Sequence, residues 1–173
     1  MKQLQISKID AALRQLQTAI LLYFNARDPV SIHTLTAASY NIIRDLRDFR
    51  SESFSMFKDA LNIREHYKKE FRDLLNESEN FFKHADRDPN KNHLFRTDST
   101  ELLLIDACDA YIRLMGEIPD LVSIFKRWHL IQHPQYYRED AHAYQIAIQG
   151  NQVYSDSDRF LFFQDCFQSK LKI

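Results

Sequence analysis

The segment from Asn80 to Arg87 (NFFKHADR) holds the densest group of side chains that could carry out chemistry. Asn80 and His84 are one helical turn apart, so a helix would place them on one face. A histidine titrates near neutral pH and can act as a general acid or base. We therefore predict a ligand-binding site here, made of Asn80, Lys83, His84, Asp86 and Arg87. Asn80 and His84 are its candidates for catalysis.

The same segment also has a purely structural interpretation. Lys83 and His84 would then complement the negative C-terminal end of a helix dipole, and residues 86–89 (DRDP) would form an ordinary turn. His33 is a further ligand-binding candidate, provided that it faces the end of the bundle that holds Asn80 and His84. The alternative for His33 is a histidine on the surface or one next to a helix cap.

His129 and His133 form a second constellation, a pair with the spacing that can bring two imidazoles to one metal ion. Position 130 is leucine, whereas the HExxH motif of zinc proteases would need glutamate there. The alternative is a partly exposed helix end before Pro134. We expect no cofactor, and His129 and His133 are the candidates for ligands if a metal ion is bound.

Composition excludes several classes of function. Two glycines in 173 residues cannot build a glycine-rich phosphate loop. A net charge of -1 provides no global field for nucleic acid, and the two cysteines have no paired spacing. Because no run of about 18 apolar residues occurs, we expect no membrane partner and a cytoplasmic location.

Periodic apolar residues predict helices along most of the chain. Residues 8–50 form an antiparallel hairpin, in which Asp28 caps and Pro29 begins the second helix. Residues 86–97 read as an exposed loop, and residues 98–101 (DSTE) as a capping box before a buried helix that ends at Gly116. Residues 135–173 carry a weaker helical pattern. The predicted fold is all-α, a single bundle of about six to eight helices.

The hairpin resembles the start of a known superfamily. Residues 8–46 (KIDAALRQLQTAILLYFNARDPVSIHTLTAASYNIIRDL) are similar to the first helical hairpin of the HEPN (higher-eukaryote and prokaryote nucleotide-binding) superfamily. The resemblance implies a compact bundle that often dimerises, and active members are metal-independent ribonucleases with an Arg-x(4–6)-His motif. Arg87 to His93 and Arg127 to His133 have that spacing. Asn80 to His84 matches the common Arg-Asn-x3-His form, except that Glu79 replaces the arginine.

Three functions follow as hypotheses. The first is a HEPN-like binding or regulatory module, with a homodimer or another protein as partner and RNA or a nucleotide as a ligand. The tyrosines at 136, 137, 144 and 154 would suit a protein interface. The second is a HEPN-type endoribonuclease that uses His84 and Asn80. The glutamate at position 79 would repel phosphate, so Lys83 or Arg87 would have to supply the positive charge. The third is a metal-binding helical bundle.

Overall fold

The computed structural model describes residues 3–59, 64–86 and 89–170. Within these ranges the chain is all-α, with seven α-helices and no strand, as predicted. The helices are α1 (Lys8–Phe24), α2 (Pro29–Phe49), α3 (Lys68–Lys83), α4 (Asp98–Met115), α5 (Asp120–Gln132), α6 (His142–Val153) and α7 (Arg159–Lys170). Four 3-10 turns accompany them, η1 (Phe57–Asp59), η2 (Glu65–Tyr67), η3 (Pro134–Tyr136) and η4 (Asp156–Asp158). None of the described helices is long and apolar enough to cross a membrane.

The predicted hairpin is confirmed as α1 and α2. Ser7 and Asp10 form a reciprocal capping box at the start of α1. The Asp28 side chain accepts a hydrogen bond from the backbone N–H of Ser31 at 2.8 Å and caps α2. The hydroxyl of Ser39 donates to the carbonyl oxygen of Ala12 at 2.8 Å across the hairpin, an approach that the small side chains permit.

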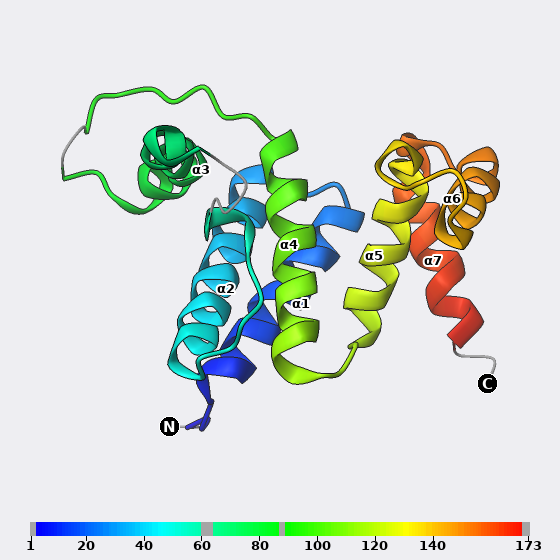
Figure 1. Ribbon diagram of the computed structural model, residues 1–173, viewed down its shortest axis with the longest axis horizontal. Helices are drawn as coiled ribbons and strands as arrows, with labels where there is room; N and C mark the ends of the chain where they lie inside the picture. Colours follow the sequence, from blue (N-terminus) through cyan, green and yellow to red (C-terminus); the bar gives the residue numbers. More distant parts are fainter. Residues whose placement is uncertain (1–2, 60–63, 87–88, 171–173) are drawn as a thin grey trace.

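Helix α4 packs alongside α2 and also contacts α1 and α5 (Figure 1). It is predicted as a buried helix that ends at Gly116, and Gly116 does end it, in the left-handed conformation with φ of 70°. The predicted capping box at residues 98–101 is wrong. Asp98 is already the first helical residue, and no side chain caps the helix. Glu101 is therefore available for other contacts.

Aromatic side chains fill the core where α1, α5 and α7 meet. Trp128 and Phe125 from α5, Phe24 from α1 and Phe162 from α7 are all buried. Their rings contact one another edge to face or stacked. This cluster ties the C-terminal helices to the hairpin, so the weakly patterned residues 135–170 still pack as helices.

Helix α3 and the segment that follows it form the opposite end of the molecule (Figure 1). Residues 89–97 contain no helix, and most of them are exposed, in agreement with the predicted loop. A buried ion pair between Lys58 and Glu79 joins α3 to η1. Three side chains of this loop, those of His93, Leu94 and Arg96, line a cavity together with residues of the first turn of α4.

Candidate functional site

Three potential metal ligands meet between the start of α4 and the end of α5. Glu101 lies in the first turn of α4, His129 in the last turn of α5, and His133 caps the same helix. One ligand atom from each lies within 4.8 Å of the other two. The Nε2 atom of His133 is 3.0 Å from a carboxylate oxygen, Oε1, of Glu101. The structure thus adds a carboxylate to the predicted histidine pair.

The local sequence explains this arrangement. His129 and His133 are one helical turn apart, and their ring centroids are 4.5 Å apart. Pro134 follows His133 and α5 ends there, so His133 takes an irregular backbone conformation at the helix terminus. The ring of Tyr136 stacks on His133 at 5.2 Å and covers one face of the imidazole.

His129 is the most constrained member of the cluster. Only 6% of its surface is exposed, and neither ring nitrogen has a hydrogen-bond partner among the described residues. Burial, together with the neighbouring His133, lowers the pKa of His129 to about 4. At neutral pH the ring is uncharged and one nitrogen keeps a free lone pair. That is the form in which histidine binds metals.

A second layer of hydrogen bonds holds Glu101 in place. Its Oε2 atom accepts a hydrogen bond from the Tyr23 hydroxyl at 3.0 Å. The Tyr23 oxygen in turn accepts one from the buried Trp128 indole N–H at 3.1 Å. Burial raises the pKa of Tyr23, so its hydroxyl remains a donor to the carboxylate. Such outer contacts fix the orientation of a metal ligand.

A cleft of about 360 Å³ opens beside Glu101, the one member of the three potential ligands that lines it. Its walls include Tyr23, Arg27, Asp156 and Arg159. The guanidinium of Arg159 lies over the Tyr23 ring, 5.1 Å from its centroid. A molecule in the cleft would therefore lie next to the carboxylate and between side chains of both charges.

The predicted site on α3 is arranged differently. Asn80 and His84 are both exposed at the end of the helix, and the backbone N–H of His84 donates to the carbonyl of Asn80 at 3.1 Å. Asp86 is exposed, whereas Arg87 lies outside the described residues. The ammonium group of Lys83 contacts the carboxylate of Glu79 at 2.6 Å. The assignment of a ligand to these residues stays a prediction.

Glu79 itself has a structural role. It is 7% exposed, and its carboxylate also contacts Lys58 Nζ at 2.7 Å and the side-chain amide of Asn41 at 2.6 Å. Burial alone would raise the pKa of Glu79, but the hydrogen bonds from Lys58 and Lys83 outweigh it and hold the pKa below its ordinary value. Two ammonium groups, those of Lys58 and Lys83, thus neutralise the Glu79 carboxylate.

His33 is buried, so the prediction of a surface position is wrong. Its ring packs against Phe82 of α3 at 5.8 Å and against Phe95 of the loop at 5.2 Å. It therefore faces the C-terminal part of α3, but the cavity that it lines does not include Asn80 or His84.

Glu101 is the residue that sequence reasoning missed. It lies 28 positions before His129, so no local spacing connects them, and its place after Asp98 imitates a capping box. Only the packing of α4 on α5 brings the three ligands together. Arg127, which has the HEPN spacing from His133, is exposed on α5, and His133 contacts Glu101.

Comparisons with protein-family models, with curated proteins and with solved structures found no match for this chain. Its function is therefore inferred from the chemistry of its own residues.

Proposed function

We propose that this protein is a helical bundle that binds a divalent transition-metal ion through Glu101, His129 and His133. The observation that carries the proposal is the buried His129 ring, whose two nitrogens have no partner among the described residues. Leaving a buried polar group unpaired costs about 1–3 kcal/mol, and coordination would remove that cost. Two imidazoles and a carboxylate are ligands that zinc and iron(II) accept.

The geometry supports the same proposal. With metal–ligand distances of about 2.0–2.2 Å and tetrahedral angles, neighbouring ligand atoms lie about 3.3–3.6 Å apart. The present contact between His133 and Glu101, at 3.0 Å, is shorter than that spacing, so the two side chains would move slightly apart to share an ion. His129 has to approach by a small side-chain rotation, because the group spans up to 4.8 Å. Three protein ligands leave at least one coordination position for water or a substrate from the adjoining cleft.

Calorimetric titration of zinc into chelator-treated, untagged protein tests the proposal. We expect one ion per chain, with affinity reduced at least 100-fold in His129→Ala and in Glu101→Gln. His142→Ala is the matched control, since His142 is an exposed histidine outside the cluster. Equal zinc affinity in the wild type, His129→Ala and His142→Ala would refute the assignment.

The HEPN-like module remains a second candidate, favoured by one observation. Asn80 and His84 are exposed together at the end of α3, where an RNA or a protein partner has access. If this candidate is a ribonuclease, it cleaves RNA in the presence of EDTA and loses activity in His84→Ala. If it is a regulatory module, it binds RNA or dimerises without cleavage. Either result is independent of zinc binding at Glu101.

A further inference from the structure

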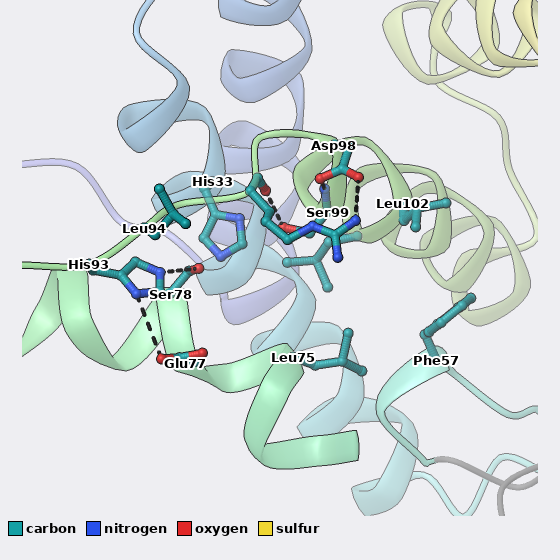
Figure 2. A pocket seen from close by; sticks show the side chains of 12 residues that line it. His33, Phe57, Leu75, Glu77, Ser78, His93, Leu94, Asp98, Ser99 and Leu102 are labelled. Carbon is teal, nitrogen blue, oxygen red and sulfur yellow. Dashed lines mark hydrogen bonds and ion pairs between the residues drawn. The ribbon is translucent and has the colours of Figure 1, made fainter. Parts of the chain in front are cut away.

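A second cavity lies on the other side of the first turn of α4. Its volume is about 210 Å³, and it is lined by side chains from α2, η1, α3, the start of α4 and the loop between α3 and α4 (Figure 2). Much of its wall is apolar, with Phe57, Leu75, Leu94, Leu102 and Leu103. An apolar cavity of about 150 Å³ is enough to hold benzene, so this one can hold a single substituted ring.

His33 supplies a buried polar group in this wall. The residue is 2% exposed, and its Nδ1 atom is 3.0 Å from the hydroxyl of Thr100. Its Nε2 atom has no hydrogen-bond partner among the described residues and no contact with solvent. A ligand would reach this atom after a small tilt of the ring, and its own hydroxyl would then provide the missing hydrogen bond.

The charged residues of the wall have partners within it. Arg96 pairs with Asp98 at 2.9 Å. His93 contacts Ser78 at 2.8 Å through Nε2 and lies 3.7 Å from the Glu77 carboxylate through Nδ1, as the dashed lines in Figure 2 show. Burial, with a further contribution from Lys58, lowers the pKa of His33 to about 4, so His33 is neutral at pH 7. An anionic ligand would find no unpaired positive charge among the described residues of this wall.

We propose that this cavity binds a small neutral molecule, about the size of one substituted benzene ring, which carries one hydrogen-bonding group for His33. Few polar groups in a largely apolar wall are typical of small-molecule sites. The cavity shares no residue with the metal ligands, so this proposal does not depend on the metal.

Phenol, benzene and benzoate are suitable probes, titrated into the ¹⁵N-labelled protein and followed by amide chemical shifts. We expect phenol to bind saturably, with shifts concentrated in residues 93–103. Benzoate should bind at least about tenfold more weakly, because burying an unpaired charge is costly. Benzoate binding as tight as phenol, or no saturable phenol binding, would overturn the proposal.

Two substitutions identify the site. Leu102→Trp should fill the cavity and abolish phenol binding, whereas Leu161→Trp, at a similarly exposed leucine on α7, should leave it unchanged. Unchanged phenol binding in Leu102→Trp counts against the proposal. In His33→Leu we expect the preference for phenol over benzene to fall about 5- to 10-fold, since the orphaned nitrogen is gone. An unchanged preference in a folded His33→Leu protein would show that this histidine does not select the ligand.

Discussion

Replacing Glu79 with glutamine should destabilise the fold by about 3–5 kcal/mol, because it leaves the buried ammonium of Lys58 without a counter-ion. Lys58 is 2% exposed and lies 2.7 Å from the Glu79 carboxylate. The lysine can escape by losing its proton, which at pH 7 costs about 5 kcal/mol from an ordinary pKa of 10.5. This limit sets the upper end of the range.

Guanidinium chloride unfolding at pH 7 measures the effect. Asp73→Asn is the matched control, since it breaks the exposed pair between Lys69 and Asp73 on the same helix and should cost less than about 0.5 kcal/mol. The double variant Lys58→Met/Glu79→Gln should be more stable than Glu79→Gln alone, because no buried charge remains.

The pH dependence of Glu79→Gln provides a second check. Without its partner, Lys58 should have a folded-state pKa far below its unfolded value, so the unfolded chain binds more protons between the two. Stability of the variant relative to wild type should then rise with pH, by up to about 1.4 kcal/mol per unit between pH 7 and 9. A cost below about 1 kcal/mol at pH 7, or a defect that does not change with pH, would refute the assignment of Lys58 and Glu79 as a buried ion pair.

Three further predictions concern the metal site and the core. Tyr23→Phe removes the acceptor of the Trp128 N–H, so it should lower the free energy of unfolding by about 1–3 kcal/mol. It also removes the hydroxyl that donates to Glu101, so zinc binding should weaken about 10- to 100-fold in calorimetry. Unchanged zinc affinity would contradict the role of this hydrogen bond in holding Glu101. Gly150→Ala should destabilise the protein by about 1 kcal/mol in denaturant melts, because the new methyl group would lie 2.6 Å from Ile131 Cγ1. The cost of this clash exceeds the gain in helix propensity from alanine. If Gly150→Ala is equally destabilising in the Ile131→Ala background, the clash is not its cause. The pKa of His129, about 4, lies below its value in the unfolded chain, so the neutral ring stabilises the metal-free protein fully above pH 6.5. As pH is lowered from 6.5 toward 4, the free energy of unfolding should fall by about 1.4 kcal/mol per pH unit from this group. His129→Gln should lose this contribution, and an identical pH dependence of stability in both proteins would contradict the neutral buried ring.

The sequence was sufficient for the fold because its helix signals are local. The Ser7 cap and the Asp28-Pro29 turn define α1 and the start of α2, and Gly116 ends α4. A spacing of three or four residues can be read without knowing the tertiary contacts. The capping box predicted at residues 98–101 was wrong because that prediction also considered only local residue types. In the folded chain Glu101 contacts His133 instead.

The candidate sites were harder to predict because they depend on residues far apart in the chain. The spacing of His129 and His133 made them candidates for metal ligands, but only tertiary packing reveals Glu101 beside them. Lys58 resembles an ordinary surface lysine in the sequence, yet it is buried against Glu79. Lysines are rarely buried without a partner. The sequence does not show that Lys58 pairs with Glu79, so it does not reveal that Lys58 is buried.

The first turn of α4 is shared by the walls of both candidate sites. Thr100 contacts His33 at the small cavity, while its neighbour Glu101 contacts His133 at the metal ligands. Consecutive residues on a helix point about 100° apart, so one turn addresses two separate pockets. Any rotation of this turn about the helix axis would displace both contacts at once, so the turn mechanically couples the two candidate sites.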